Sequence, residues 1–388
     1  MRRKNRKNTA VLSLILAVCL LTSCGGARSR LAAGGDDGYF DMEFHAGGRD
    51  ARPENTLYAY QYALENGAMT IECDMQMTKD GVLVMSHNAV LNPDITTDAD
   101  GNIVQPNTLY IHDMTLEEVK QYNVGRTYDT SLYHSVHGET LVQTDAAIPT
   151  MREFFNLVRD SGRDDVRLNI EAKYYTDPEL GVLCEKNPDK DELLNAFLEV
   201  VREYDFTDRV MLQSFDWDLL VRMEKLAPEI ETVALYSTDH EWERLQASTF
   251  MLAGESSGAN PDLANFLDIS DEEAGEHADE EAGEQTGGVR YFGNNPIKIA
   301  YALGIDNVSP HYDELSKGRV ALAHKLGMKV IPWTVNDRDI MEWLYYIGVD
   351  GIITDKPWVL REFLESVGED VAPVINLDLP YHLEPDHY

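Results

Sequence analysis

Two acidic residues separated by a single position mark the first place in this sequence where chemistry is expected. Glu72 and Asp74 lie in the apolar run Met69–Met75. Side chains of a strand alternate between its faces, so both carboxylates point to one side. Acids in such surroundings repel each other unless a cation or basic groups compensate. Oxygen ligands without sulfur or imidazole suit hard cations, so the pair predicts a Ca²⁺ or Mg²⁺ site. The alternative is an exposed strand edge that binds nothing.

A second pair with the same spacing follows in the run Asn169–Lys173. Glu171 and Lys173 are expected to share one face of a strand. A buried Lys–Glu pair with a purely structural purpose is the alternative. His45 precedes the first acidic pair and His87 follows it. Imidazole titrates near neutrality, which suits it to proton transfer.

The order of these residues resembles that of the glycerophosphodiester phosphodiesterase family. The motifs that carry the likeness are His45-Ala46-Gly47, Pro53-Glu54-Asn55-Thr56, Glu72-x-Asp74, Thr78-Lys79-Asp80-Gly81 and His87-Asn88. Later motifs are similar as well, at Leu212–Phe215, Ile331–Asn336 and Gly351–Pro357. The resemblance therefore runs from about residue 40 to about residue 360.

This resemblance implies a phosphoric diester hydrolase that converts glycerophosphodiesters to glycerol 3-phosphate and an alcohol. It implies a divalent cation, Ca²⁺ or Mg²⁺, held by Glu72, Asp74 and Glu171. It implies acid–base catalysis by His45 and His87, with the order of the two roles open. The candidate substrate contacts are Lys173 for the phosphate, Trp333 as a wall of the glycerol pocket, Gln213 and Arg52.

Two positions depart from the family pattern. Ala46 stands where the family has an arginine that is expected to hold the phosphate, and Asn88 stands where it usually has an aspartate. Arg49 or Arg52 could supply the missing cation, although neither occupies the matching position. Two other functions therefore remain open. One is a catalytically weak lipoprotein that binds a phosphorylated glycerol or sugar, and the other is a related phospholipase that acts on intact lipid head groups.

Several residues near these motifs also have structural explanations. Pro53–Thr56 is a sound helix start, so its polar residues are expected mainly to cap a helix. Lys79–Gly81 is expected to be a hairpin turn. Three further histidines have no carboxylate at a fixed helical spacing and are not expected to be functional: His112, His134 and His137.

The elements that must position these residues alternate between strands and helices. Strands are predicted at Phe40–His45, Met69–Met75, Val166–Lys173, Val210–Phe215, Thr232–Tyr236, Asn307–Pro310, Lys329–Val335 and Gly351–Thr354. Helices are predicted between them, for example at Thr150–Arg159, Lys190–Tyr204 and Leu315–Leu326. The economical fold is an α/β (β/α)8 TIM barrel, whose catalytic residues gather at the carboxyl ends of the strands. An open doubly wound sheet is the rival, but no glycine-rich phosphate fingerprint follows the first strand.

Two segments interrupt the alternation within the expected barrel, residues 39–365. Val82–His87 is predicted to pair with the second strand, and residues 91–148 are expected to form an insertion over the barrel mouth with one helical piece at Thr115–Tyr122. Residues 254–288 are predicted to be a disordered acidic loop, because Asp268–Glu284 carries nine acids and neither Lys nor Arg. Residues 366–388 are expected to be a C-terminal tail.

The N-terminus resembles a bacterial lipoprotein signal. Arg2–Lys7 is basic, and Ala10–Leu21 is apolar but too short to span a bilayer as a mature helix. The resemblance implies that a signal peptide, residues 1–23, is removed and that Cys24 carries a lipid. Residues 24–38 would then be a flexible tether of an exported, membrane-anchored protein. An ordinary secretory signal with a chance cysteine is the alternative.

The charge of the chain argues against several partners. The formal net charge is −35 and becomes −40 when the five basic residues of the signal are removed. Such a chain is not expected to bind nucleic acid or an anionic bilayer through its own surface. The expected partners are a small-molecule substrate and a membrane reached through the lipid anchor alone, and the oligomeric state stays open. Cys73 and Cys184 show no disulfide spacing, and Cys73 is expected in the packing layer.

Overall fold

The computed structural model describes residues 40–175, 182–237 and 295–382. The expected signal peptide 1–23, the lipidation candidate Cys24, the tether 24–38 and the acidic loop 254–288 lie outside the described residues. The end of the expected tail, residues 383–388, lies outside them too.

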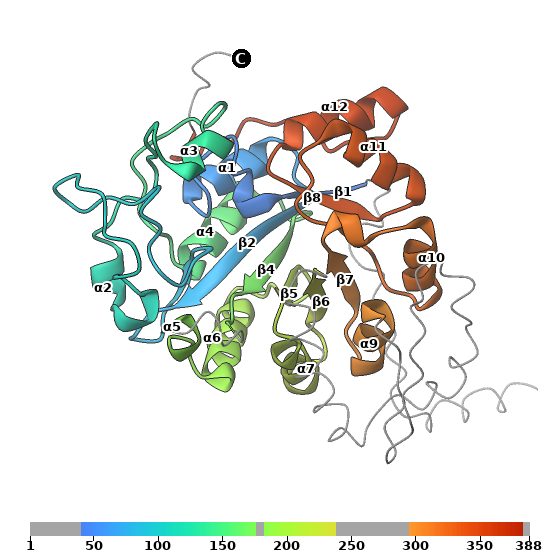
Figure 1. Ribbon diagram of the computed structural model, residues 1–388, viewed down its shortest axis with the longest axis horizontal. Coiled ribbons are helices and arrows are strands. Elements are labelled where there is room, and N and C mark those ends of the chain that lie inside the picture. Colours follow the sequence, from blue (N-terminus) through green and yellow to red (C-terminus); the bar gives the residue numbers. More distant parts are fainter. Residues whose placement is uncertain (1–39, 176–181, 238–294, 383–388) are drawn as a thin grey trace, which may run out of the picture.

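A curled parallel sheet forms the centre of the molecule (Figure 1). Its neighbouring strands are β7 (Asn307–Pro310), β6 (Glu231–Tyr236), β5 (Val210–Ser214), β4 (Arg167–Ala172), β2 (Thr70–Met77), β1 (Asp41–Phe44) and β8 (Gly351–Thr354). The register places Glu171 opposite both Asp74 and Gln213. β3 (Leu83–Met85) pairs antiparallel with β2 after a turn in which Gly81 has a φ of 77°. The hairpin prediction is therefore confirmed.

Residues 329–335 occupy the barrel position between β7 and β8 without forming a regular strand. The Ile331 amide donates to the Val308 carbonyl at 3.1 Å, and the Ile353 amide donates to the Pro332 carbonyl at 3.0 Å. Proline has no amide proton, so the ladder is interrupted at Pro332. The prediction of a strand at Lys329–Val335 is wrong in this respect. The segment nevertheless closes the ring, and the predicted (β/α)8 barrel fold is confirmed.

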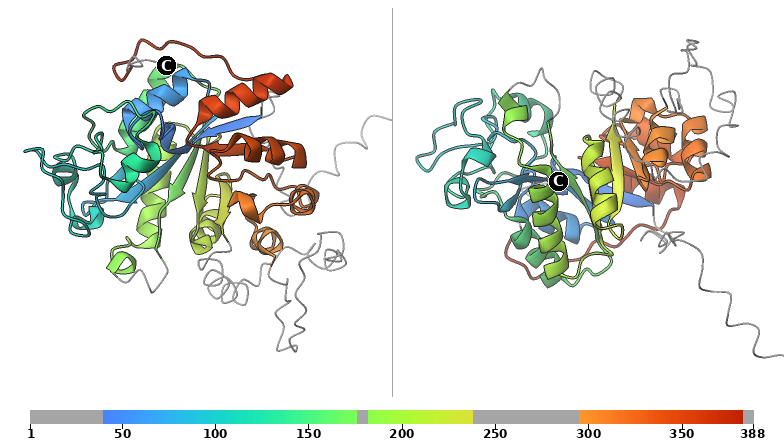
Figure 2. Two further views of the ribbon diagram at one scale, coloured as in Figure 1. Left: turned by 45° about the horizontal axis from the view of Figure 1, so that its top comes forward. Right: turned by 90° about the horizontal axis from the view of Figure 1, so that it is seen from below.

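Helices surround the outside of the sheet, as the views in Figure 2 show. The longer ones are α1 (Leu57–Glu65), α4 (Met151–Ser161), α6 (Lys190–Glu203), α7 (Trp217–Leu226), α9 (Pro296–Leu303), α10 (Lys317–Lys325), α11 (Arg338–Ile347) and α12 (Pro357–Val367). The short α5 is Val182–Glu185. Thr150 and Glu153 form a capping box that starts α4, and Ser316 caps α10. Because such caps fix where a helix begins, the predicted helix positions hold to within two residues.

Apolar side chains fill the layer between sheet and helices, whereas polar side chains line the barrel interior. On β2, Ile71 and Cys73 belong to the main apolar cluster, so the alternating Glu72 and Asp74 face the interior. Cys73 lies in the packing layer as predicted, and neither it nor Cys184 forms a disulfide within the described residues. Polar groups buried in this way require partners, and these partners define the site described below.

Residues 91–148 form an apolar cluster of their own beside β3. Its buried members are Val84, Leu91, Val104, Ile111, Met114, Val119, Val124 and Ile148. The helix expected at Thr115–Tyr122 is shorter, α2 (Leu116–Val119), and begins with a Thr115–Glu118 capping box. Residues 91–148 also contain η2 (Ile111–Asp113) and α3 (Leu132–His137), and this segment covers the left side of the barrel in Figure 1.

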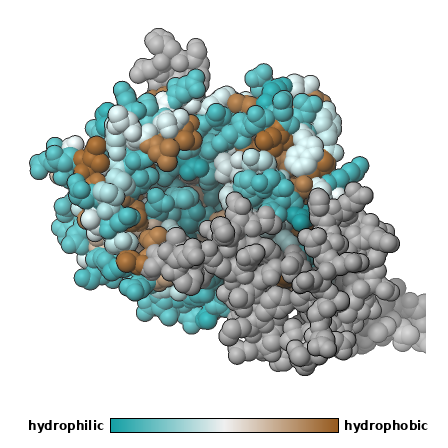
Figure 3. Space-filling model, in the orientation of Figure 1, coloured by the Kyte–Doolittle hydropathy of each residue, from teal (hydrophilic) through white to brown (hydrophobic). Residues whose placement is uncertain are grey.

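The chain that follows α12 packs along α1. The Ile375 amide donates to the Glu65 carbonyl at 2.7 Å, and the Tyr381 amide donates to the Gln61 side chain at 2.8 Å. None of the helices in the described ranges has the length and apolar character of a membrane span. On the face shown in Figure 3, hydrophobic residues form small separate patches among hydrophilic ones.

Candidate active site

Three buried carboxylates meet at the carboxyl ends of β2 and β4. Glu72, Asp74 and Glu171 each offer an oxygen, and these oxygens lie within 4.8 Å of one another. The strand register explains the meeting, because Asp74 pairs with Glu171 across two parallel strands. The structure therefore brings together in one cluster the three acids that the sequence analysis singled out by their spacing.

Each carboxylate of the cluster is oriented by a neighbouring donor. For Glu72, the Ala46 amide donates to Oε2 at 3.0 Å and Gln213 Nε2 donates to Oε1 at 2.7 Å. For Asp74, Asn55 Nδ2 donates to Oδ2 at 2.8 Å. Gln213 therefore donates to a carboxylate of the cluster, and its contact with substrate stays a prediction. Oxygens held in this way are presented to whatever occupies the space between them.

Pro53–Thr56 was predicted mainly to cap a helix, and Asn55 has a second contact beside that cap. Thr56 is the cap of α1 and accepts from the Ala59 amide at 3.3 Å. Asn55 instead adopts a φ of 53°, and its Oδ1 accepts from the Asp74 amide at 3.1 Å. The asparagine thus holds Asp74 through both ends of its side-chain amide.

Lys173 partly compensates the negative charge of the cluster. Its Nζ lies 2.7 Å from Glu171 Oε2 and 3.2 Å from Asp74 Oδ1. Burial alone would raise the pKa of Asp74, but Lys173 and the two histidines outweigh burial and hold the pKa below its ordinary value. Burial, followed by the charge of Asp74, raises the pKa of Glu72 well above its ordinary value.

The cluster fits a divalent cation on its own chemistry. Three carboxylates face one ammonium group, so negative charge is in excess. The buried Oδ1 of Asp74 makes no hydrogen bond among the described residues and has only the ion pair with Lys173. An all-oxygen donor set with excess charge is the kind that Ca²⁺ and Mg²⁺ prefer.

His45 lies directly after β1 with its ring held by Asp355. Nδ1 is 2.7 Å from Asp355 Oδ1, and Nε2 is 3.8 Å from Glu72 Oε2. A carboxylate only accepts, so the proton of the neutral ring sits on Nδ1 and Nε2 faces the cluster. Burial would raise the pKa of Asp355, but Arg49 and His45 hold it well below its ordinary value. Asp355 is therefore ionised and fixes the ring of His45.

The turn that carries His45 depends on Gly47. Gly47 has a φ of 83°, and a Cβ at this position would lie 2.8 Å from Ala59 Cβ. A side chain cannot be accommodated there without displacing α1. Ala46 precedes it with a φ of 49°, which aims its amide at Glu72.

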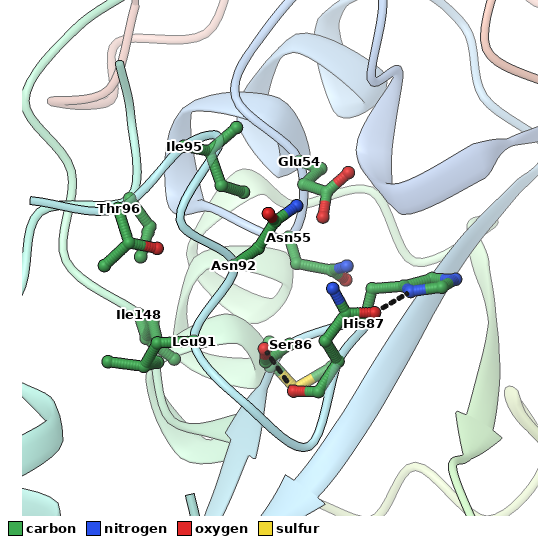
Figure 4. A pocket seen from close by; sticks show the side chains of 12 residues that line it. Glu54, Asn55, Ser86, His87, Leu91, Asn92, Ile95, Thr96 and Ile148 are labelled. Atoms are coloured by element: carbon green, nitrogen blue, oxygen red, sulfur yellow. Dashed lines mark hydrogen bonds between the residues drawn. The ribbon is translucent and has the colours of Figure 1, made fainter. Parts of the chain in front are cut away.

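His87 follows β3 and lies at the edge of a pocket. Its Nδ1 is 2.8 Å from Asn88 Oδ1, so the residue that replaces the family aspartate accepts from the ring. Burial and then the charge of Lys173 lower the pKa of His87. In Figure 4, His87 and Glu54 lie on one side of the pocket, and Leu91 and Ile148 lie on the other.

Of the two arginines considered from the sequence, the structure brings Arg49 to the histidine. Arg49 Nε donates to Asp355 Oδ1 at 3.0 Å, and Nη2 lies 3.0 Å from His45 Nδ1. Arg52 is buried beside α1, where it donates to the Ala51 carbonyl at 2.8 Å and stacks at 4.9 Å on Tyr62. The proposed contact of Arg52 with substrate therefore has no support in its described neighbours.

Trp333 lies on the rim of the barrel in an aromatic group. Its Nε1 donates to the Ser309 carbonyl at 2.8 Å. Its ring meets Phe215 at 5.4 Å and His311 at 5.2 Å, both edge to face. Trp333 is partly buried in this aromatic group, and its contact with a glycerol moiety stays a prediction.

His137 has a buried partner that the sequence did not suggest. Its Nδ1 contacts Asp50 Oδ1, which attaches α3 of the insertion to the turn after β1. Asp50 and His137 come within 4.8 Å of Asp355, but the Asp355 oxygens are already bonded by His45, Arg49 and Asn336. Lys356 Nζ lies 3.7 Å from Asp50 Oδ2. Because Arg49 and Lys356 already lie beside these carboxylates, we interpret Asp50, His137 and Asp355 as part of an ion-pair network and not as a second metal site.

His112 and His134 do not join the cluster. His112 Nδ1 lies 3.3 Å from the Met77 carbonyl, and His134 Nε2 lies 3.8 Å from Asp129. Asp355 is the most informative residue that spacing alone does not connect to the site. Its position at the end of β8 was the available signal, because barrel strands end at the catalytic face.

Comparisons with known proteins agree with this arrangement. The profile of the family described as "Glycerophosphoryl diester phosphodiesterase family" matches residues 45–359. A relative from Caldanaerobacter subterraneus subsp. tengcongensis, named "Glycerophosphodiester phosphodiesterase", is 28% identical over 324 residues, which cover 84% of this chain and 97% of that protein. A Bacillus subtilis protein of the same name is 25% identical over 320 residues, with 81% and 82% covered.

Solved structures share the fold. The crystal structure of a Silicibacter pomeroyi protein named for this phosphodiesterase activity superposes with a TM-score of 0.66 at 24% identity and covers 87% of this chain and 99% of that chain. An Oleispira antarctica phosphodiesterase, solved in complex with the product sn-glycerol-3-phosphate, gives a TM-score of 0.54 at 20% identity, with 85% and 99% covered. At these identities the likeness concerns the barrel architecture.

Proposed function

This chain belongs to the glycerophosphoryl diester phosphodiesterase family, and from that premise we propose a mechanism. In it, His45 and His87 act as acid and base in the hydrolysis of a glycerophosphodiester, and a divalent cation assists them. The chain is a glycerophosphodiester phosphodiesterase, a phosphoric diester hydrolase. The products in this proposal are glycerol 3-phosphate and an alcohol. The observation that carries the mechanism is the buried cluster of three carboxylates with His45 Nε2 3.8 Å from Glu72 Oε2.

Glu72, Asp74 and Glu171 are the proposed holders of the cation, Ca²⁺ or Mg²⁺. When bound, a divalent cation supplies positive charge that polarises a phosphoryl oxygen and lowers the barrier by several kcal/mol. The chain contributes the orientation of the ligands through Ala46, Asn55 and Gln213. Support comes from the buried excess of negative charge and from the all-oxygen donor set.

The two histidines are proposed to have different duties because their neighbours differ. His87 has a lowered pKa and an amide neighbour, so it is neutral near pH 7 and accepts the proton of the attacking hydroxyl. His45 donates through Nδ1 to the ionised Asp355, which fixes the ring with Nε2 toward the carboxylate cluster. Its Nε2 is therefore the proposed donor of a proton to the leaving alcohol.

Two cations of the chain are proposed to hold the phosphate. Lys173 lies inside the cluster, and burial opposed by Asp74 and Glu171 leaves its pKa above the ordinary value, so the ammonium is charged. Arg49 lies beside His45 and uses Nε for Asp355 and Nη1 for Glu54, the latter at 3.5 Å. A guanidinium has five N–H groups, so donors remain for a phosphate oxygen.

A turnover assay tests the proposal directly. The purified protein, stripped of metal, is given glycerophosphocholine, glycerophosphoethanolamine, glycerophosphoglycerol and an intact phospholipid, with and without Ca²⁺ or Mg²⁺. Release of glycerol 3-phosphate only in the presence of a cation is the expected result. Release of a phosphorylated head group from intact lipid would instead favour the phospholipase alternative, and binding without turnover would favour the binding lipoprotein.

The roles of the histidines can be separated with a substrate in which glycerol 3-phosphate is esterified to nitrophenol in place of choline. Nitrophenol leaves without the help of an acid, so His45→Ala should lose less activity on this substrate than on glycerophosphocholine. His87→Ala should lose a similar factor on both, because the base is still needed. The opposite ranking would exchange the two assignments.

Export and lipidation at Cys24 are also part of the proposal. The support is the sequence of a basic run, an apolar run and Leu21-Thr-Ser-Cys24. An anchor of this type would leave the catalytic barrel attached to the membrane through the tether 24–38.

A further inference from the structure

A chain of buried amides leads from the carboxylate cluster into the barrel interior. Gln213 Nε2 donates to Glu72 Oε1 at 2.7 Å. Asn169 Nδ2 donates to Gln213 Oε1 at 3.2 Å and to Glu43 Oε2 at 2.9 Å. The four residues come from β2, β5, β4 and β1, and each is at most 2% exposed. This row of hydrogen bonds therefore links the proposed cation ligand Glu72 to Glu43, which has no part in the proposed mechanism.

Two oxygens in this chain lack a donor among the described residues. They are Glu43 Oε1 and Asn169 Oδ1, both fully buried. The two side chains already face each other, because the second polar atom of Asn169, Nδ2, donates to the second oxygen of Glu43, Oε2. An ionised carboxylate offers only acceptors, so this arrangement would leave two buried acceptors without donors, which is unfavourable.

A carboxylic acid satisfies both oxygens at once. A protonated carboxyl group has one O–H donor and one carbonyl acceptor, and a primary amide has the complementary N–H and carbonyl. Face to face, the two groups form a ring with an N–H···O bond on one side and an O–H···O bond on the other. The Nδ2–Oε2 bond at 2.9 Å is one half of that ring. The two oxygens without donors are the atoms that the other half requires.

The surroundings favour the protonated form of Glu43. Burial, followed by the charge of Asp41 on the same strand, raises the pKa of Glu43 well above its ordinary value. Glu231 of β6 acts in the same direction, whereas Asn169 and Arg167 of β4 act against it. The acid is thus the form in which this carboxyl group is least costly to bury.

We propose that Glu43 is a neutral carboxylic acid that pairs reciprocally with Asn169 and, through Asn169 and Gln213, fixes Glu72 for cation binding. This inference rests on the proposed cation site. Asn169 keeps a single orientation, because a flipped amide would place its oxygen against Gln213 Oε1, acceptor to acceptor. Asn169 then directs an N–H to Gln213 Oε1, which turns Nε2 of Gln213 toward Glu72. Glu43, Asn169 and Gln213 are therefore positioning residues, and none of them needs to touch the substrate.

Calorimetric titration of Ca²⁺ and of Mg²⁺ into the chelator-treated full-length protein tests the relay. Glu43→Gln keeps one acceptor and one donor on the side facing Asn169, so the affinity should stay within about threefold of wild type. Asn169→Leu and Gln213→Leu remove the relay, and loss of such outer contacts weakens metal binding about 10–100-fold. Ser309→Ala removes a different buried barrel hydrogen bond, to the Ile331 carbonyl at 2.6 Å, and is the matched control. It should lower the melting temperature without changing the affinity.

Infrared spectroscopy tests the protonated pair without any metal. The difference spectrum of wild type minus Glu43→Gln at neutral pH should contain the carbonyl band of a carboxylic acid, shifted in D₂O. Absence of this band, or a Glu43→Gln affinity loss as large as that of Asn169→Leu, would overturn the inference. An Asn169→Leu affinity equal to that of Ser309→Ala would overturn it as well. If wild type binds neither cation, the proposed cation site itself fails, and the infrared band alone then decides the pair.

Discussion

Replacement of Asp355 by asparagine is the most direct test of how the site is held together. Oδ1 of Asp355 accepts from His45 Nδ1 at 2.7 Å and from Arg49 Nε at 3.0 Å, and Oδ2 accepts from Asn336 Nδ2 at 2.7 Å. An asparagine has one acceptor end. In either orientation of its amide, a donor therefore faces a donor.

The expected losses follow from these contacts. Where the new amide presents its nitrogen to His45, the ring has to give up its Nδ1 proton or turn away, and kcat should fall by up to about 10²–10⁴-fold, the range of a lost acid or base. The charge-assisted bond to Arg49 would also be lost, and such bonds are worth about 1.5–3 kcal/mol. Both side chains are largely buried, at 16% and 3% exposure, so solvent screening reduces this figure little. The free energy of unfolding should fall by a similar amount.

A double-mutant cycle with His45→Ala separates catalysis from stability. Asp355 acts on the reaction mainly through His45 and also holds Arg49, so the losses of the two single variants should not multiply in full in the double variant. Release of glycerol 3-phosphate from glycerophosphocholine measures kcat, and urea unfolding measures stability. An Asp355→Asn variant with kcat within twofold of wild type, or losses in the two single variants that multiply in the double variant, would refute the reasoning.

Four further outcomes are expected. EDTA should abolish turnover and Ca²⁺ or Mg²⁺ should restore it, while Glu72→Ala should lose cation binding in calorimetry; full activity in chelator would remove the metal from the mechanism. Since the pKa of His87 is lowered, its neutral form persists in acid, and the acid limb of the kcat/KM profile should lie below about pH 6.5; His87→Ala should remove that limb. Arg49→Ala should reduce kcat/KM about tenfold or more, and Arg52→Ala should change it far less, as kinetics on glycerophosphocholine will show. Cys24→Ala should shift the protein out of the membrane fraction or leave it unprocessed, and a processed variant that still sediments with membranes would contradict the lipoprotein hypothesis.

The parts of the fold that follow from a local period could be predicted from the sequence. The inward placement of Glu72 and Asp74 needs only the alternation of β2, and their proximity to Glu171 needs only that parallel strands end at one face. Helix starts such as Thr150 carry a capping signal in their own side chains. The strand expected at Lys329–Val335 failed because an interior proline outweighed its apolar pattern.

The pairwise contacts within the site that the sequence did not predict depend on long-range pairing or on backbone turns. His45 and Asp355 are 310 residues apart in sequence, and no spacing rule connects them. Asn55 looks like a capping residue by type, and only its φ of 53° turns its amide to Asp74. Arg49 and Arg52 are three positions apart, and the tight turn that begins at His45 decides which of them reaches the histidine.

The same turn explains why an alanine at position 46 is compatible with the proposed cation site. What this residue gives the cluster is its backbone amide, which donates to Glu72 Oε2 at 3.0 Å whatever the side chain. The turn geometry is imposed by Gly47, where a Cβ would lie 2.8 Å from Ala59. The guanidinium of Arg49 lies 3.0 Å from the ring of His45. We therefore infer that the departure from the family pattern moves positive charge by three residues along the turn while the orientation of Glu72 is retained.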